Sequence, residues 1–238
     1  MNHQELRERI APPRPEEGPF VISVWGGKGG ITKSTLAFLL SYELGKIGPT
    51  LLINADAKQA DGGVTEMTAN LRVPATFELT ESDDPAELHA VRRLKQFRYV
   101  ITDNQPFRDR EKLKAAAKAD LVVVPMPPRR SDMKSVLRSI RDVLQPERAP
   151  YRIILSMIEH SAKGKAKTMK DTLNTLSMPV YDGWIRKYTA HEMLSGLPVT
   201  LSEEDNADKA AEDVYMFIDA TLAHLGEPYK AVRKEVTA

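Results

Sequence analysis

Short apolar runs alternate with longer amphipathic segments along most of this chain. Six runs rich in β-branched and aliphatic residues have the length of buried strands and lie at residues 20–24, 50–54, 99–102, 121–124, 152–156 and 180–185. Residues 132–144 and 207–224 carry apolar side chains at helical spacing. Because strands that alternate with helices pair in parallel, the pattern predicts an α/β fold with a doubly wound, mostly parallel sheet flanked by helices.

The remaining segments have weaker patterns. Within residues 57–98 we expect a strand near 76–79 and a helix near 85–95. The lysine-rich run at residues 163–170 has almost no bulky apolar side chain, which predicts a mobile loop able to contact phosphates. The domain prediction is a Pro-rich N-terminal tail at 1–19, one domain at 20–226 and a C-terminal tail at 227–238.

The most specific motif, Trp-Gly-Gly-Lys-Gly-Gly-Ile-Thr-Lys-Ser-Thr, occupies residues 25–35, between the first apolar run and a helical pattern. Glycines let backbone N–H groups turn toward phosphate oxygens, and the helix N-terminus adds partial positive charge. Lys33 can neutralise the β- and γ-phosphates, and the Ser34 hydroxyl can bind Mg²⁺. The predicted phosphate-binding residues are Gly27, Lys28, Gly29, Gly30, Ile31, Thr32, Lys33, Ser34 and Thr35.

This loop departs from the ordinary Walker A pattern, because Thr32 stands where the last glycine is usual. A second lysine, Lys28, precedes Lys33 by five positions. The loop resembles the deviant Walker A sequence of the ParA/MinD/nitrogenase-iron-protein branch of P-loop ATPases, and fits the ParA-type DNA-partition ATPases best. The resemblance implies a P-loop NTPase of deviant Walker A type whose ATP-bound homodimer places Lys28 at the partner subunit's nucleotide.

Later segments follow the same family in order. Asp56 follows the second apolar run, where the family has the sequence Asp-x-Asp-Pro-Gln, and Asn54 stands in place of the first aspartate of that motif. Asp103 ends the apolar run that resembles the Walker B strand. The resemblance implies that Asp56 orients the attacking water and acts on the metal indirectly, and that Asp103 holds Mg²⁺ through a water opposite Ser34. Lys28, Lys33 and Asp56 are therefore the expected catalytic residues. Met157 and Ile185 fall in the stretches that resemble the nucleotide-binding ends of two further strands.

Composition narrows the function further. The chain has no cysteine, which excludes the iron–sulfur members of this branch, disulfides and thiol catalysis. The net charge of +1 gives no overall signature of nucleic-acid binding. The resemblance nevertheless implies non-specific DNA binding by basic residues late in the chain, and Arg186, Lys187 and Lys209 fall near such positions. With no secretory signal, long apolar span or basic amphipathic tail, we expect a cytoplasmic protein without a membrane partner. The resemblance further implies that the protein associates with the nucleoid.

The resemblance implies a partition ATPase that uses ATP and Mg²⁺ and forms an ATP-dependent homodimer. It also implies that a ParB-like centromere-binding protein stimulates the ATPase. Two other classes fit the same motif. One is a weakly hydrolysing positioning or scaffold protein for another cargo, which the departures at Thr32 and Asn54 favour. The other is a metabolic ligase of the dethiobiotin-synthetase type, against which Lys28 argues because a trans-acting lysine suits a dimeric switch.

Overall fold

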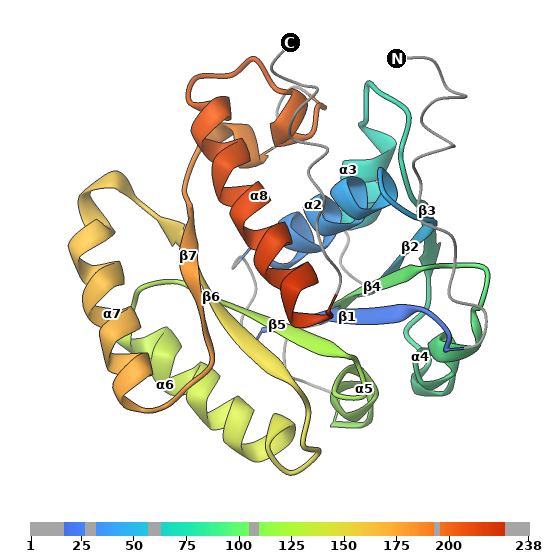
Figure 1. Cartoon of the computed structure of the whole chain (residues 1–238), viewed down its shortest axis with the longest axis horizontal. Helices are drawn as coiled ribbons and strands as arrows, with labels where there is room; N and C mark the ends of the chain where they lie inside the picture. Colours follow the sequence, from blue (N-terminus) through green and yellow to red (C-terminus); the bar gives the residue numbers. More distant parts are fainter. Residues whose placement is uncertain (1–16, 27–31, 57–62, 105–109, 193–195, 227–238) are drawn as a thin grey trace.

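The computed structural model describes residues 17–26, 32–56, 63–104, 110–192 and 196–226. Their strands form one seven-stranded parallel sheet in the order β3-β2-β4-β1-β5-β6-β7 (Figure 1). The strands are β1 (Phe20–Val24), β2 (Thr50–Ala55), β3 (Glu78–Glu81), β4 (Tyr99–Asn104), β5 (Leu121–Met126), β6 (Tyr151–Ile158) and β7 (Val180–Arg186). The predicted doubly wound α/β fold is therefore confirmed, with a sheet that is parallel throughout.

Helices cover both faces of the sheet (Figure 1). On one face lie α2 (Lys33–Gly45), α3 (Val64–Ala69) and α8 (Ala207–His224), which share a core cluster with apolar side chains of the strands. On the other face lie α4 (Pro85–Ala90), α5 (Arg110–Ala116), α6 (Arg130–Ser139) and α7 (Lys163–Thr175), with the second core cluster. The central strands β1, β2, β4 and β5 are buried along their whole length, which is why they appear in the sequence as continuous apolar runs, whereas the edge strand β3 is mostly exposed.

Two weakly patterned segments differ from prediction only in their bounds. The strand expected near residues 76–79 forms at Glu78–Glu81, and the helix expected near 85–95 is α-helical only to Ala90, followed by a 3₁₀ turn at Val91–Arg93. Similarly, α6 continues into a π-helical turn at Ile140–Leu144, so the predicted helix 132–144 is built in two parts. Short 3₁₀ turns also form at His160–Ala162, Thr189–Glu192 and Val199–Leu201.

The lysine-rich run at residues 163–170 is not a loop, and that prediction is wrong. These residues form the first half of α7. Ala166, Met169 and Leu173 are buried at helical spacing in the second core cluster. Small and flexible apolar side chains are enough to dock this helix, while its lysines stay on the solvent side, so the sequence showed little apolar character.

The strand order places a topological switch point at β1. From β1 the chain crosses to β2 on one side, whereas the later strands β5, β6 and β7 extend the sheet on the other. In open α/β sheets, ligands bind in the crevice at the carboxyl ends of the strands at such a point. The end of β1 is where the predicted phosphate loop begins, so topology and motif indicate the same location.

The predicted tails fall mostly outside the described residues, so the division of the chain at 19 and 226 stays a prediction. Among the helices that the structure describes, none combines the length and the apolar character that crossing a bilayer requires.

Candidate nucleotide-binding site

Three parallel strands bring the predicted phosphate-site residues together. Strand pairing sets Asp103 beside both Val24 of β1 and Asn54 of β2, so these strands end at the same level. Asp56 follows β2 directly, and Lys33 and Ser34 open α2. Gly27, Lys28, Gly29, Gly30 and Ile31 lie outside the described residues, so their predicted contacts with phosphate stay predictions.

Lys33 and Asp103 form the buried electrostatic centre of the site. Their exposed fractions are 6% and 1%. Burial lowers the pKa of Lys33, against the opposing attraction of Asp103 and Asp56. Burial likewise raises the pKa of Asp103 to about 6, although a hydrogen bond from Ser34 and the charge of Lys33 act in the other direction. Charges this deeply buried are stable only beside partners, which makes the pair suited to receive a charged ligand.

Magnesium fits the oxygen atoms of this site. Asp103 Oδ1 is buried without a hydrogen-bond partner among the described residues, and the Ser34 hydroxyl bonds to the same carboxylate. Mg²⁺ prefers oxygen ligands and commonly keeps waters and substrate phosphates in its shell. The described part of the chain has no cluster of three or more histidine, cysteine or acidic side chains that could hold an ion alone. The phosphates of a bound nucleotide would supply further oxygen ligands beside Ser34 and Asp103.

A hydrogen-bonded network fixes the backbone at Asp56. Its N–H donates to Asn54 Oδ1 at 3.0 Å, and Asn54 Nδ2 donates to Thr65 Oγ1 at 2.9 Å. Thr65 in turn donates to Glu81 Oε1 at 2.6 Å. Asn54 thus replaces the family's first aspartate with a side chain that closes a local turn and positions Asp56. Thr65 and Glu81 were not expected from the sequence, because they lie in the weakly patterned segment 57–98.

Thr32 is held in the left-handed backbone region, with φ of 64° and ψ of 16° at the N-cap of α2. A β-branched residue is strained in this region, whereas glycine adopts it freely. Walker A loops usually have glycine at this position, because glycine adopts the left-handed conformation without strain. The Thr32 side chain makes no capping hydrogen bond to the first turn of α2.

Substituting Thr32 by glycine is expected to raise stability by roughly 0.5–1 kcal/mol, because relief of the left-handed strain exceeds the entropic cost of glycine. We expect the basal rate of ATP hydrolysis to rise or stay unchanged. Ser177→Gly is the matched control, because Ser177 is also left-handed, at φ of 55°, but lies at the end of α7. Urea unfolding and steady-state hydrolysis measure the two effects. A clear loss of rate in Thr32→Gly alone would show that Thr32 contributes to the chemistry.

A cavity of about 210 Å³ adjoins the start of α2. The structure brings the predicted nucleotide-binding residues Met157 and Ile185 to this cavity, together with Thr32 and Thr35. Sequence reasoning missed His191, which also lines it. A histidine in a short 3₁₀ turn carries no periodic signal, so only the fold shows that it is buried.

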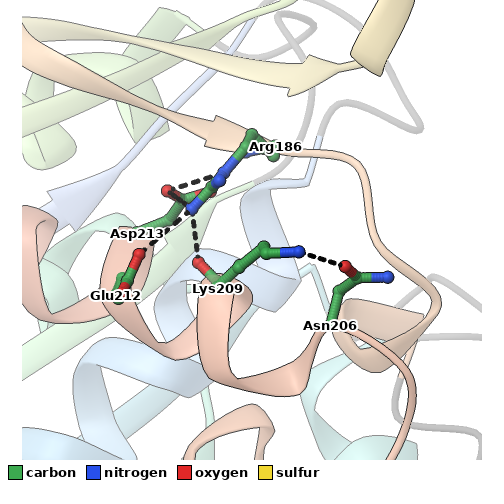
Figure 2. A network of polar contacts seen from close by, with 5 residues as sticks. All are labelled: Arg186, Asn206, Lys209, Glu212 and Asp213. Atoms are coloured by element: carbon green, nitrogen blue, oxygen red, sulfur yellow. Dashed lines mark hydrogen bonds and ion pairs between the residues drawn. The ribbon is translucent and has the colours of Figure 1, made fainter.

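Arg186 is the centre of a polar network between β7 and α8 (Figure 2). Its backbone N–H donates to Asp213 Oδ2 at 2.9 Å, and its guanidinium contacts both oxygens of that carboxylate. It also donates to the carbonyl oxygen of Lys209 at 2.7 Å. The guanidinium predicted to contact DNA is thus engaged within the fold. Lys187 is exposed, and Lys209 is exposed with its ammonium bonded to Asn206 Oδ1 at 2.8 Å, so these two remain the more accessible of the three.

Replacing Asp213 by alanine is expected to lower the free energy of unfolding by about 3 kcal/mol, because it leaves a partly buried guanidinium without its main partner. Glu212→Ala is the control, since that carboxylate is 71% exposed and lies 3.7 Å from the same guanidinium. An exposed pair contributes about 0–1 kcal/mol. Equal losses in the two variants, measured by urea unfolding, would contradict the structural role assigned to Asp213.

Comparison with known proteins agrees with this geometry. No protein-family model matches the chain. Among named relatives, it is 28% identical over 198 residues to the Maintenance of carboxysome distribution protein A of Gloeobacter kilaueensis, covering 82% of this chain and 90% of that one. It is 25% identical over 222 residues to Protein ParA of Rhizobium radiobacter, covering 87% and 98%.

Solved structures share the fold. The MinD cell division protein of Aquifex aeolicus has a TM-score of 0.65 at 20% identity, covering 90% of this chain and 99% of that one. A plasmid partition protein of Borrelia burgdorferi bound to AMPPNP has a TM-score of 0.65 at 18% identity, with 85% and 99% covered. MinD of Pyrococcus horikoshii complexed with Mg-ADP has a TM-score of 0.64 at 16% identity, with 84% and 95% covered.

The sheet order, the site at the end of β1 and these neighbours define the fold of a ParA/MinD-type P-loop NTPase. The relatives named ParA and carboxysome distribution protein A confirm the resemblance to the deviant Walker A branch that the phosphate loop indicated.

Proposed function

We propose that this protein is an ATP-dependent dimerising switch that binds DNA without sequence preference and supports the partition or positioning of a cargo. The observation that carries the proposal is the convergence of Lys33, Ser34, Asp56 and Asp103 at the carboxyl ends of β1, β2 and β4. Binding and hydrolysis of a nucleoside triphosphate use this combination of a buried cation, a hydroxyl and two carboxylates. The dimer is proposed from the family resemblance, which places Lys28 at the partner subunit's nucleotide.

The residues of the site divide the chemistry between them. Lys33 neutralises charge on the β- and γ-phosphates, and burial strengthens that interaction because the local dielectric constant is low. Asp56, held by the Asn54 turn, orients the attacking water. Ser34 and Asp103, the latter through a water, would hold Mg²⁺, which supplies further neutralisation of phosphate charge when it is bound.

Unstimulated hydrolysis is proposed to be slow. Thr32 restricts the loop beside Lys33, and Asn54 provides no carboxylate near the metal shell. The residues that bind the nucleotide and position the water, Lys33, Ser34, Asp56 and Asp103, are all present. Because the basal rate is slow, a partner protein would be required for rapid turnover. By the family resemblance, that partner is a ParB-like centromere-binding protein.

A second candidate function is the positioning of a cargo other than a plasmid. The relative named for carboxysome distribution favours it, because it matches this chain over 90% of its own length. The ligase alternative lacks such support, since none of the relatives and structures reported above is a ligase. Plasmid partition and the positioning of another cargo would use the same ATP-dependent switch and would differ only in the cargo and the partner protein.

Sedimentation velocity tests the switch. We expect a monomer with ADP and a dimer with ATP or a non-hydrolysable analogue, because the resemblance places Lys28 at the partner subunit's nucleotide and ADP lacks the γ-phosphate. The same species in all three conditions would contradict the proposal.

A further inference from the structure

A small group of polar side chains is buried in the second core cluster, directly behind Asp103. Ser23 of β1 and Thr102 and Asn104 of β4 are 1%, 4% and 5% exposed. Apolar side chains from the α4 and α5 side surround this polar group, namely Leu88, Val91, Ala115 and Ala116. Polar groups in such surroundings cost free energy unless they are hydrogen-bonded, and apolar groups of the same shape can be equally stable. The polar group therefore indicates a role other than stability.

This polar group does not face a ligand site. The cavity that its three side chains line has a volume of about 10 Å³, which is at most enough for a single water. The cavity lies on the α4 and α5 side of the sheet, whereas the phosphate-site residues Lys33 and Ser34 open α2 on the other side. Its hydrogen bonds therefore act on the strands themselves.

Asn104 joins the end of β4 to the end of β1. Its Nδ2 lies 2.8 Å from Ser23 Oγ and 3.0 Å from the carbonyl oxygen of Val24, the last residue of β1. In its own strand, the same nitrogen lies 2.9 Å from Thr102 Oγ1 and 3.1 Å from the Thr102 carbonyl oxygen. Thr102 Oγ1 in turn donates to Ser23 Oγ at 3.2 Å. A buried network that is satisfied in this way makes the local geometry rigid.

Asp103 and Asn104 point to opposite sides of the sheet from the same strand end, because successive side chains of a strand alternate. The Asp103 carboxylate accepts a hydrogen bond from Ser34 of α2, whereas Asn104 faces α4 and α5. Strand pairing sets Asp103 beside Val24, from which the chain continues toward the predicted phosphate loop. The Asn104 amide thus fixes, from behind, where the Asp103 carboxylate lies relative to the start of that loop.

We propose that Asn104 is a positioning residue for the metal side of the nucleotide site. By tying the end of β4 to Ser23 and Val24, it holds the Asp103 carboxylate where it can act together with Ser34 on one Mg²⁺. The inference rests on the proposed nucleotide-binding function and adds a residue that touches neither the nucleotide nor the metal. Replacing groups that orient the ligands of a metal typically lowers metal affinity by about 10- to 100-fold.

Calorimetric titration of ADP in Mg²⁺ and in EDTA tests the proposal, because the ratio of the two affinities isolates the contribution of the metal. Asn104→Leu has a side chain of similar size without a hydrogen-bond donor. We expect the gain in ADP affinity that Mg²⁺ provides to fall about tenfold in this variant, with the affinity in EDTA unchanged. A residue that served stability alone would not change this ratio.

Thr102→Val is the matched control. It removes a hydroxyl from the same buried polar group without changing its shape, and it leaves both contacts of Asn104 with β1 in place. It should therefore keep the wild-type gain from Mg²⁺, whatever its stability in urea. Ser23→Ala removes one of the two β1 partners of Asn104 by deleting a single oxygen. It should lose a smaller part of the gain, and it provides the same test if the leucine variant does not fold.

A wild-type gain from Mg²⁺ in Asn104→Leu, or in Ser23→Ala where the leucine variant does not fold, overturns the positioning role and leaves nucleotide binding intact. An equal loss in Thr102→Val also overturns it, because the loss would then follow from any change in this polar group. A wild type that binds ADP equally with and without Mg²⁺ overturns the inference alone. Failure of the wild type to bind ADP in either condition overturns the proposed function and this inference together.

Discussion

Replacing Asp56 by alanine is expected to reduce ATP hydrolysis by at least about 100-fold, the usual contribution of a positioned acid–base group. ATP binding should be retained, because Lys33, Ser34 and Asp103 still form the buried phosphate site. Water positioning stabilises the transition state more than the bound ground state. The variant should therefore accumulate as the ATP-bound dimer, which size-exclusion chromatography with ATP would detect.

Asp182→Ala is the control for this variant, because the Asp182 side chain is fully exposed on β7 and remote from the β2 terminus. Its hydrolysis rate should match the wild type. Hydrolysis by Asp56→Ala at the wild-type rate would remove Asp56 from the chemistry and leave the Asn54 turn without a catalytic purpose.

Lys28→Ala is expected to separate nucleotide binding from switching. Lys33 provides the charge within the same subunit, so ATP should still bind. The resemblance assigns Lys28 to the partner's nucleotide, so ATP-dependent dimerisation and hydrolysis should both be lost. Sedimentation and hydrolysis assays check the two effects, with Lys165→Ala on the exposed side of α7 as the control. A Lys28→Ala protein that dimerises normally with ATP would show that Lys28 is not needed across the interface.

Hydrophobic patterning predicted most of the fold, because the central strands β1, β2, β4 and β5 are buried on both faces and so form continuous apolar runs. Phe20–Val24 forms within the predicted bounds, and the other five predicted strands are confirmed with slightly wider limits. Helix α7 was not predicted, because Ala166 and Met169 dock it with little bulk. Local periodicity cannot show a helix whose stability comes mainly from tertiary contact.

The phosphate site could be predicted better than its surroundings. Its residues follow a fixed spacing along a strand–loop–helix unit, and parallel pairing then aligns Asp103 with Val24. By contrast, Glu81 reaches the backbone of Asp56 through Asn54, which it contacts both directly and through Thr65, in a network between three elements. His191 lines the cavity beside α2 only because the fold buries it against Tyr188. Such contacts depend on tertiary geometry, which sequence spacing does not encode.

The sequence alone also could not distinguish between the basic residues late in the chain. Arg186, Lys187 and Lys209 are equivalent as sequence, but the fold gives them different roles. The Arg186 guanidinium is 19% exposed and paired with Asp213, so reversing its charge would disturb the fold as well as any DNA contact. Lys187→Glu and Lys209→Glu are therefore the sharper probes of a DNA surface.

Association with random-sequence duplex DNA, measured with ATP, with ADP and without nucleotide, tests the central claim most directly. We expect binding only with ATP, weakening steeply with salt because phosphate contacts release counterions. Lys187→Glu and Lys209→Glu should weaken it without changing ATP affinity, whereas Lys95→Glu, an exposed charge away from these positions, should not. Equal binding with and without nucleotide, or no binding at low salt, would contradict the account of an ATP-gated DNA-binding switch.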